Sequence, residues 1–546
     1  MQLPATCDYL IVGAGSAGCV LANRLSANAE VDVVLVEAGP PDDSWLIRTP
    51  AAVGALIKHP RYNWNFQTVP QTHLAGRRIP MPRGKVLGGT SSINGMVYIR
   101  GHASDYTEWE RAGGQGWGYP DLLPYFLRSE RNEAWPSSAF HSTAGPMNVT
   151  SIRPHNPLVD RFLEAACSLD FPACEDFNAA SMDGFGPRQA TIRGGLRESM
   201  ATAFLRPVRH RRNLTVLTDC FVRRIVIEEG RSAGVELERE GSVHRVGARI
   251  ETILSAGSFG SPAILMHSGI GNEQFLRTLG ITVHRHAPEV GENLQDHLAT
   301  SILMRTNSPE SYGLSWRALP RAIGTVAEYL LLRRGPLASN VFEAHGFVRS
   351  DPGLTLPDLQ IIFMPAFRNP SGFPIPLGHG YGINVALLAP RSRGRVMLTG
   401  PDPRAQPSID PNFLGESSDL PPLVHGLKLA RRLLYAPAFA PFKSHEVAPG
   451  PQAQDDAALE EHVRSSCGTV FHPVGTCRMG GDEMSVVDAQ LRVRGIQGLR
   501  VVDASVFPRQ IRGNTNAPVV MVAEKAADMI LGRSPPPPVD PRAAGV

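Results

Sequence analysis

The chain has 546 residues, of which 42% are hydrophobic and 19% charged, and its 54 basic and 51 acidic residues leave a formal net charge of +3. This length predicts at least two packed units, and the composition lies outside the range of disordered and fibrous chains. The near-neutral charge, without a long basic run, excludes a polyanion-binding protein, so we expect no nucleic-acid partner.

Cysteine usage and hydropathy narrow the class of protein further. The seven cysteines are scattered without a CxxC pair, which predicts neither a disulfide framework nor a zinc site, and we expect no metal ligands. No apolar run approaches the ~20 residues of a membrane-spanning helix, and the first residues lack the pattern of a secretory signal. We therefore expect a cytoplasmic protein that associates with the inner membrane at most peripherally.

The first elements in the chain have the pattern of a βαβ unit. An apolar strand ends at Val12, a glycine-rich turn follows, and a helix-like run at 19–26 leads to a second apolar strand at 31–36. This succession of strand, glycine turn, helix and strand is typical of a dinucleotide-binding fold.

The glycine turn, Gly13-Ala14-Gly15-Ser16-Ala17-Gly18, carries the chemistry of this unit. Gly13 permits the tight turn, Gly15 lets the backbone approach a pyrophosphate, and Gly18 lets helix and strand pack closely. Glu37, at the end of the second strand, is placed to accept hydrogen bonds from ribose hydroxyls. An acid at this spacing fits NAD or FAD, but a glycine turn at the N-terminus of so long a chain favours a flavoprotein.

Loops and strands follow in the next two hundred residues. Residues 40–82 are rich in Pro, Trp and Asn, which predicts long loops. Residues 228–230, Glu-Glu-Gly, predict a hairpin turn within a strand-rich region. The strands predicted in this region are 214–217, 221–227 and 250–254.

The character of the chain changes at about residue 301, where we place a second domain. Residues 317–334 predict a helix, and its apolar end at 329–334 fits either a membrane-surface helix or a buried helix with a charged end, of which we favour the buried helix. Segments punctuated by Pro and Gly, such as 369–374, follow. A strand at 499–502 and a helix at 517–530 then return to the first unit.

Several separate blocks of the sequence, in their order along the chain, resemble the glucose-methanol-choline (GMC) family of FAD-dependent oxidoreductases, on its choline-dehydrogenase-like, alcohol-dehydrogenase branch. Residues 82–95 look like the family's first signature and residues 257–271 like its second. The further blocks are 291–297, 471–480, 502–505 and 513–518.

The resemblance implies the fold and the activity. It implies a Rossmann-like FAD-binding domain of α/β class, discontinuous in sequence, and an α+β substrate-binding domain with an antiparallel sheet. We expect residues 1–300 to belong mainly to the FAD-binding domain, 301–480 mainly to the substrate-binding domain, 481–533 to the FAD-binding domain again, and 534–546 to a Pro-rich tail. The implied reaction is oxidation of a small alcohol to an aldehyde or ketone by hydride transfer to flavin N5, with dioxygen or a quinone as electron acceptor.

The cofactor residues combine the glycine turn with positions that the resemblance supplies. Small residues at 88–92 offer backbone N–H groups and hydroxyls suited to a diphosphate, and Asp503 could bond ribityl hydroxyls or cap the next turn. The residues expected to bind FAD are Gly13, Gly15, Ser16, Ala17, Gly18, Glu37, Ala38, Arg83, Gly88, Thr90, Asn94, Gly95, Met96, Val97, Val222, Asp503, Ala504, Asn514 and Thr515.

Two residues are the catalytic candidates. Taken alone, one histidine among 17 is more often a structural residue than a catalytic base. The resemblance reverses this expectation for His472, because the family places its base at the histidine before the proline of this block. A group that titrates near neutrality can take the hydroxyl proton as the hydride leaves. The family has His or Asn at the position of Asn514, and an asparagine can hold the alkoxide oxygen although it cannot act as a base.

Two departures from the family limit the transfer. Ile93 stands where some family oxidases have a histidine bonded to the flavin, so we expect non-covalent FAD. Residues 298–306 contain no acid and include Arg305, whereas choline-specific members have a glutamate there, so we expect neutral alcohols to be better substrates than choline. Two alternatives stay open: a GMC-type lyase with structural FAD, and a non-catalytic FAD-binding protein.

Overall fold

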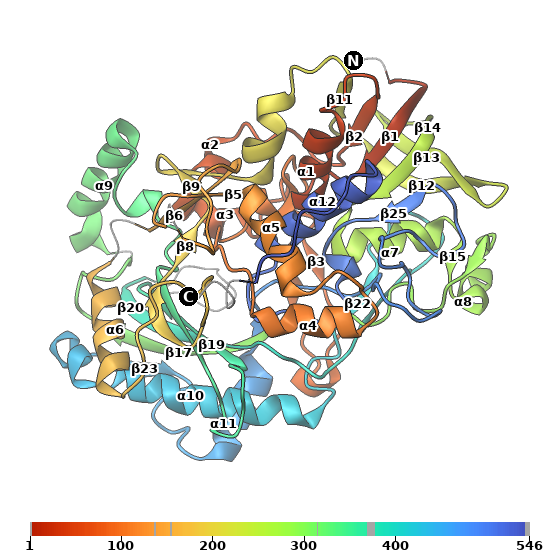
Figure 1. The fold of residues 1–546 in the computed structure, drawn as a ribbon. Helices are drawn as coiled ribbons and strands as arrows, with labels where there is room; N and C mark the ends of the chain where they lie inside the picture. Colours follow the sequence, from red (N-terminus) through yellow and green to blue (C-terminus); the bar gives the residue numbers. More distant parts are fainter. Residues whose placement is uncertain (1–2, 136–137, 153–155, 314, 368–376, 541–546) are drawn as a thin grey trace.

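The computed structural model describes residues 3–135, 138–152, 156–313, 315–367 and 377–540, and the segment expected at 369–374 lies outside these ranges. Its two largest sheets have seven strands each. One sheet occupies the upper right of Figure 1 and the other the lower left. Segments from both ends of the chain join the first sheet, so the unit built on it is discontinuous in sequence.

The first sheet has the strand order β11–β2–β1–β14–β13–β12, with β25 paired to β14. β11, β2, β1, β14 and β25 are parallel, whereas β12 and β13 form an antiparallel hairpin beside them. The predicted turn at 228–230 is confirmed, because it joins these two hairpin strands. The strands are β1 (Thr6–Val12), β2 (Val33–Val36), β11 (Leu214–Leu217), β12 (Phe221–Glu228), β13 (Arg231–Arg239), β14 (Ser242–Leu254) and β25 (Leu499–Val501).

Helices from distant parts of the chain pack together on this sheet. α1 (Ser16–Leu25) packs against α12 (Asn516–Ile530), and α12 packs against α5 (Tyr119–Ser129). α12 is buried on every side over most of its length, which explains why its sequence is apolar with little periodicity. Its buried Glu524 is neutralised by Arg24, whose guanidinium lies 2.6 Å away. The helix predicted at 517–530 is confirmed.

The second sheet is antiparallel, in the order β23–β17–β20–β19–β18–β7, with β24 paired to β17. Its first strand along the chain, β7, lies more than a hundred residues before the next, β17. The strands are β7 (Gly184–Pro187), β17 (Leu298–Thr306), β18 (Ala344–Val348), β19 (Leu359–Met364), β20 (His379–Leu387), β23 (His445–Ala448) and β24 (Gly468–Thr469).

The two faces of this sheet have different neighbours. Ile361 and Phe363 of β19 belong to the core that includes α10 (Leu420–Leu434), with α6 (Pro157–Ser168) and α11 (Asp456–Ser466) beside it. Figure 1 shows α10 and α11 along the lower edge of the molecule. Because successive side chains of a strand alternate between faces, Ile362 and Met364 point to the opposite face. That face is turned toward the first sheet.

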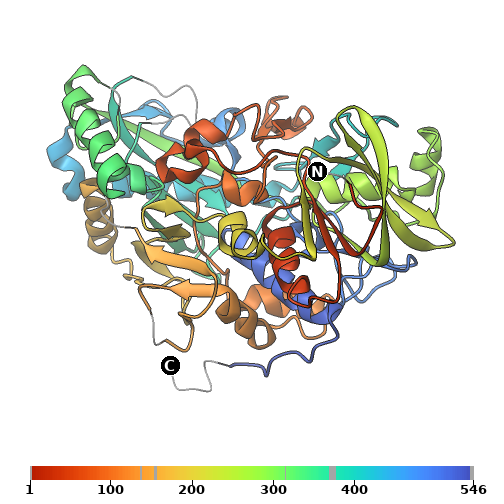
Figure 2. The same ribbon diagram turned by 90° about the horizontal axis from the view of Figure 1, so that it is seen from above.

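Residues 40–82 contain only short regular pieces, as predicted. They are α2 (Trp45–Arg48), α3 (Val53–Leu56), β3 (Phe66–Gln67) and β4 (Pro80–Met81), with 3-10 turns between them. α4 (Ala103–Arg111) follows, and α7 (Gly257–His267) and α8 (Glu273–Thr278) lie after β14. The described part of the Pro-rich tail runs along the surface, where the Val539 N–H donates to the Pro120 carbonyl at 2.9 Å (Figure 2).

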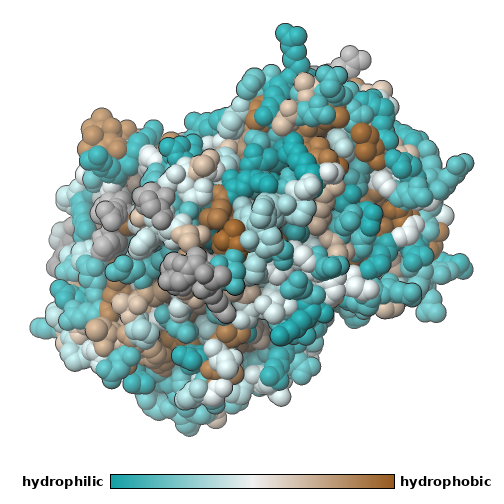
Figure 3. Space-filling model, viewed as in Figure 1, coloured by the Kyte–Doolittle hydropathy of each residue, from teal (hydrophilic) through white to brown (hydrophobic). Residues whose placement is uncertain are grey.

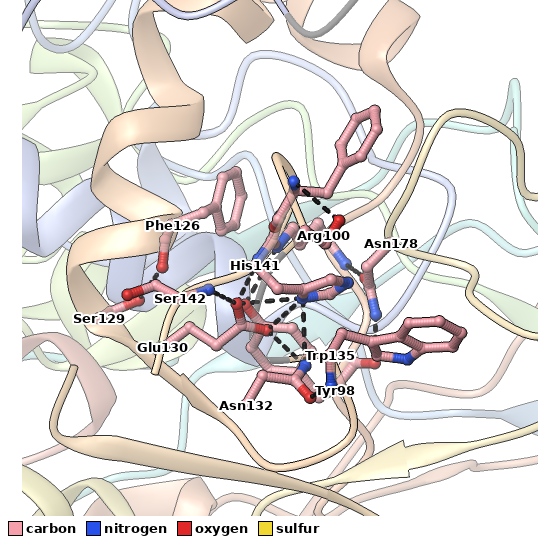
Figure 4. A network of polar contacts seen from close by, with 12 residues as sticks. Tyr98, Arg100, Phe126, Ser129, Glu130, Asn132, Trp135, His141, Ser142 and Asn178 are labelled. Atoms are coloured by element: carbon pink, nitrogen blue, oxygen red, sulfur yellow. Dashed lines mark hydrogen bonds and ion pairs between the residues drawn. The ribbon is translucent and has the colours of Figure 1, made fainter. Parts of the chain in front are cut away.

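A buried polar network anchors the segment before α4 (Figure 4). The Arg100 guanidinium donates to Glu130 at 2.9 Å, and His141 lies between Glu130 and Asp176, with its Nδ1 2.9 Å and its Nε2 2.7 Å from carboxylate oxygens. Burial opposes the charged form of His141, but the bonds to Asp176 and Glu130 dominate and raise its pKa. Arg100 and the protonated form of His141 balance two carboxylates in this network. It lies at β5 (Glu130–Asn132), β6 (Met147–Ser151) and β8 (Gln189–Ala190).

The helix predicted at 317–334 is present as α9 (Leu319–Leu332), but the expectation that it is buried is wrong. α9 stands away from the body of the molecule at the left of Figure 1, and its Leu331 is 80% exposed. An apolar pattern predicts a helix but does not say what covers it. Among the helices that the structure describes, none is long and apolar enough to cross a membrane.

Candidate active site

A cavity of about 430 Å³ lies between the two sheets. On one side it is lined by the glycine turn and by residues at the carboxyl ends of β1, β2 and β25, which is where parallel α/β sheets bind ligands. On the other side it is lined by Ile362 and Met364 of β19 and by Asn384 of β20. The cavity therefore joins the parallel sheet to the face of the antiparallel sheet that α10 leaves uncovered.

The structure brings nearly all the residues predicted from the sequence to this cavity. Gly18 and Gly88 are the exceptions among them, since neither lines it. Those that do are Gly13, Gly15, Ser16, Ala17, Glu37, Ala38, Arg83, Thr90, Asn94, Gly95, Met96, Val97, Val222, His472, Asp503, Ala504, Asn514 and Thr515. Ile93 also lines the cavity.

The glycines of the turn have different geometric roles. Gly13 has φ +98°, and a Cβ at this position would lie 2.5 Å from the Ser255 carbonyl oxygen. A Cβ on Gly18 would lie 1.9 Å from the Gly13 carbonyl oxygen, so Gly18 serves close packing and not the cavity. A Cβ on Gly15 would have its nearest neighbour 3.7 Å away, so the space beside Gly15 is the cavity itself.

Gly88 supports the turn from outside the cavity. Its φ is +85°, and its N–H donates to the Ala14 carbonyl at 2.8 Å. The next residue, Gly89, packs so closely that a Cβ there would lie 2.7 Å from the Gly15 Cα. The two glycine segments therefore form one backbone wall, rich in N–H groups, at this end of the cavity.

Two buried carboxylates flank this wall. Glu37 accepts hydrogen bonds from the N–H groups of Ala14 (3.0 Å) and Gly39 (2.8 Å), and its burial raises its pKa to about 7. Asp503, which follows β25, accepts from the Ser261 hydroxyl at 2.6 Å and from backbone N–H groups, and its pKa is also raised by burial. Both carboxylates are thus held in place while still facing the cavity.

His472 is fixed through its backbone at the other end of the cavity. Its N–H donates to Asp296 Oδ1 at 2.8 Å, and its carbonyl accepts from Gln510 Nε2 at 2.7 Å. The preceding residue, Phe471, has φ +70°, and its carbonyl accepts from Arg83 at 2.7 Å. Because the chain is held on both sides, the imidazole has a defined position at the cavity wall.

The protonation of the His472 ring follows from its neighbour His297. His297 Nε2 lies 3.0 Å from the Ile511 carbonyl, which only accepts, so this nitrogen carries a proton. Burial lowers the pKa of His297 to about 4, so the ring is neutral and its Nδ1 is an acceptor. His472 Nδ1 lies 3.0 Å from that Nδ1 and must therefore be the donor.

The other nitrogen of His472, Nε2, is consequently unprotonated. Burial, and next the neighbouring His297, lower the pKa of His472 well below its ordinary value, so the ring is neutral and Nε2 bears the lone pair. The Asn514 Nδ2 lies 3.0 Å from this Nε2 and donates to it. The Asn514 Oδ1 is buried and has no hydrogen-bond partner among the residues that the structure describes.

Two candidate functional residues were not predicted from the sequence, and the expectation that Arg305 lies near the substrate is wrong. His297 lies in the block at 291–297 but was given no role, and Arg188, which lines the cavity, had no sequence signal at all. Arg305 does not line the cavity: its side chain is exposed at the end of β17, 6.0 Å from the Phe367 ring centroid. Arg188, unlike Arg305, lines the cavity.

Comparison with known proteins decides the family. Family models described as "GMC oxidoreductase" match residues 7–299 and 390–523. The chain belongs to the GMC oxidoreductase family. This membership confirms the resemblance seen in the sequence.

Relatives cover the chain from end to end. The GMC protein is 42% identical over 526 residues to alcohol dehydrogenase [acceptor] of Pseudomonas putida, covering 96% of this chain and 95% of the relative. It is 43% identical over 547 residues to oxygen-dependent choline dehydrogenase of Rhizobium johnstonii, covering 98% and 99%. Pyridoxine 4-oxidase of Mesorbium loti has a TM-score of 0.87 at 33% identity, covering 97% of this chain and 100% of the other.

These findings confirm the predicted fold class, the cofactor and the class of enzyme. This GMC oxidoreductase combines an FAD-binding unit with an antiparallel substrate-binding sheet, and it is an FAD-dependent enzyme that acts on CH–OH groups. The residues around the cavity fit the cofactor. The space beside Gly15 admits a pyrophosphate against backbone N–H groups, and the Glu37 carboxylate stands at the strand end that receives a ribose.

Proposed function

We propose that this enzyme oxidises an alcohol to an aldehyde or ketone, with His472 as the general base and Asn514 as its partner. The observation that carries the proposal is the distance of 3.0 Å between His472 Nε2 and the Asn514 amide at the wall of the cavity. Bound FAD supplies a hydride acceptor, its N5. We further propose that the FAD is non-covalent, because Ile93 at the cavity wall offers no nucleophile.

His472 takes the proton of the substrate hydroxyl at Nε2. A base must be unprotonated before the reaction, and burial keeps this ring neutral at neutral pH. The proton on Nδ1 stays in its bond to His297 Nδ1, so Nε2 alone changes its protonation. The charged ring is costly in this buried site, and this favours proton transfer that accompanies the loss of the hydride over proton transfer before it.

Asn514 orients the hydroxyl. Its Nδ2–H points at the same Nε2 that receives the proton, so a substrate oxygen beside His472 lies within reach of this amide. When a substrate oxygen replaces Nε2 as its acceptor, this amide stabilises the developing negative charge without competing for the proton. Asn514 therefore shares the positioning of the oxygen, while His472 alone accepts the proton.

The two walls of the cavity are assigned to different ligands in this proposal. We propose that the glycine turn, Glu37 and Asp503 hold the FAD, and that the sheet at 301–480, together with the earlier β7, presents the substrate. Support comes from their places on opposite sides of one cavity. We also propose dioxygen or a quinone as the electron acceptor, following the words "[acceptor]" and "oxygen-dependent" in the names of the relatives.

One anaerobic experiment tests the proposal. The purified protein is mixed with a panel of alcohols without air, and loss of the yellow flavin colour is followed. We expect at least one alcohol to bleach the flavin and air or a quinone to restore it. Cyanohydrin cleavage without bleaching would instead show a lyase, and the absence of both reactions would leave an FAD-binding protein.

A further inference from the structure

Arg188 is a buried cation at the substrate side of the cavity. It lies between β7 and β8, where its backbone N–H donates to the Glu343 carbonyl at 2.9 Å, just before β18. Its side chain belongs to a residue that is only 3% exposed, and it lines the same cavity as His472. Its charge is among the causes that keep the pKa of His472 low.

The Arg188 guanidinium has no counter-ion among the residues that the structure describes. Its Nε and one terminal nitrogen are buried without a hydrogen-bond partner among the described residues. Burial is the one cause of its lowered pKa, and no neighbouring acid opposes it. Arg100, equally buried, has Glu130 at 2.9 Å. An unpaired buried charge is costly, which is why buried arginines are nearly always paired.

The cavity itself offers Arg188 no partner. Among the described residues that line it, the acids are Glu37 and Asp503, and both are engaged by backbone N–H groups at the other wall. The neighbouring His345 is neutral, since burial and next Arg188 lower its pKa, and its Nε2 also lacks a partner. The substrate side of the cavity is thus positively charged, with donors that nothing in the described chain uses.

We propose that Arg188 binds a carboxylate of the substrate, so that the preferred alcohol is a hydroxycarboxylate. The terminal nitrogen of Arg188 that is not among the buried atoms without a partner can make a charge-assisted bond to a carboxylate in the cavity, which then supplies the missing counter-ion. The inference rests on the proposed alcohol oxidation and names its substrate class. It also predicts that a trimethylammonium group is unsuited to this cavity, because that cation would meet Arg188 without an acid to balance it.

The test uses matched substrates. Hydroxycarboxylates of increasing chain length are each paired with the corresponding hydroxyamide, which has the same shape and no charge. We expect kcat/KM for the best carboxylate to exceed that for its amide about 10- to 100-fold, the worth of a charge-assisted pair. In Arg188→Met this ratio should fall to near one, and Arg188→Lys should retain part of it. Arg305→Met, which removes an exposed arginine outside the cavity, is the matched control and should leave the ratio as in the wild type.

The outcomes separate this inference from the proposed function. A carboxylate that is no better than its amide at any length, or an unchanged ratio in Arg188→Met, overturns the inference while alcohol oxidation stands. Loss of FAD from Arg188→Met also overturns it, because Arg188 would then serve the cofactor. If no alcohol bleaches the wild-type flavin, the proposed function itself fails. Inhibition of the wild type by benzoate and by benzamide tests the same point without a variant. We expect benzoate to inhibit more strongly, and equal inhibition by the two compounds contradicts the inference.

A second, independent observation concerns the exposed surface of α9. Figure 3 shows a hydrophobic protrusion at its upper left, where α9 stands in Figure 1. We define the α9 surface by its exposed apolar residues, which are Trp316, Ile323, Val326, Leu330, Leu331 and Leu332, between 47% and 80% exposed. Tyr329 is the buried residue that attaches the helix, through a bond from its hydroxyl to the Gly195 carbonyl at 3.2 Å.

The charges around the α9 surface are mostly positive. Between residues 316 and 334 the sequence has four arginines and one acid, Glu328. Arg321 on the helix and Arg333 and Arg334 at its end are exposed. An exposed apolar patch edged by arginines complements a membrane whose headgroups are anionic.

The shape of the α9 surface favours a lipid over a protein groove. Leu330, Leu331 and Leu332 are consecutive, so their side chains leave the helix about 100° apart and surround it on several sides. A groove in a partner protein would need a single apolar stripe, whereas a bilayer interface can enclose the whole end of a helix. The chain leaving α9 reaches Phe342, which lines the cavity.

We further propose that α9 docks this enzyme on an anionic membrane surface. The test is flotation of the purified holoenzyme with vesicles of phosphatidylcholine, with and without phosphatidylglycerol. The wild type should float with the anionic vesicles, and the double variant Leu330→Ser/Leu331→Ser should not. Leu354→Ser removes a partly exposed leucine elsewhere and is the control that should float. Failure of the wild type to float, equal flotation of the double variant, or a dimer in sedimentation that the double variant abolishes would each overturn the proposal.

Discussion

His297 offers the sharpest test of the geometry, because it sets the position of a proton without touching the substrate. Its Nδ1 accepts from His472 Nδ1 at 3.0 Å while its Nε2 donates to the Ile511 carbonyl at 3.0 Å. We predict that His297→Leu slows flavin reduction. The leucine leaves the His472 Nδ1–H buried and unpaired, which disfavours the productive tautomer by about 1–3 kcal/mol. The rate of flavin reduction should therefore fall about 5- to 150-fold.

His297→Asn is the matched variant, because its side chain has a similar size and can place an oxygen acceptor where Nδ1 stood. The assay is the single-turnover rate of anaerobic flavin reduction by a saturating alcohol, with FAD content measured in each variant. We expect His297→Asn to be several times faster than His297→Leu. Equal rates in the two variants, at equal FAD content, would show that the packing of the ring matters and the tautomer does not.

Three further predictions concern the cofactor, the substrate and the stability of the fold. FAD should be released intact on acid precipitation, and Gly15→Val should abolish its binding because the side chain fills the cavity; flavin left on the precipitate would refute the first expectation. Choline should have a lower kcat/KM than neutral alcohols because of Arg188, and a choline value above them all would contradict this. The pKa of His141 is raised in the folded state, so the stability that its charge contributes is present below pH ~6.5 and is lost as the pH rises through the folded pKa. His141→Gln should therefore melt at a lower temperature at pH ~6 and lose less stability toward alkaline pH, and an unchanged pH dependence of melting would refute this.

Local features of the sequence indicated which residues near the N-terminus line the cavity. The glycine turn needs residues that are neighbours in the chain, and Glu37 follows a strand whose partner strand ends at Val12, so one βαβ unit contains all of this geometry. The dihedral angle of Gly13 and the close approach at Gly18 are consequences of that one turn. The structure places these residues together because few long-range contacts are involved, and their contacts with FAD stay predictions.

The substrate side could not be predicted in the same way. His297 and His472 meet across 175 positions of sequence, and no local pattern indicates that two rings share a proton. The lack of a counter-ion at Arg188 depends on all the residues packed around it, which come from distant parts of the chain. The inference from Arg305 was wrong because one residue of a strand does not show which end of the sheet reaches the cavity. The exposure of α9 escaped for a related reason, since an apolar sequence is compatible with a core or a membrane surface.

The central claim, that His472 is the base, is tested most directly by the rate of anaerobic flavin reduction in His472→Ala across pH, with Asn514→Ala beside it. We expect His472→Ala to keep FAD and lose about 10²- to 10⁴-fold in rate, with a smaller loss in Asn514→Ala. The wild-type rate should fall only well below pH 6.5, as the pH approaches the lowered pKa of His472, and this acid limb should vanish in His472→Ala. Normal flavin reduction with an unchanged acid limb in His472→Ala would show that another group accepts the proton.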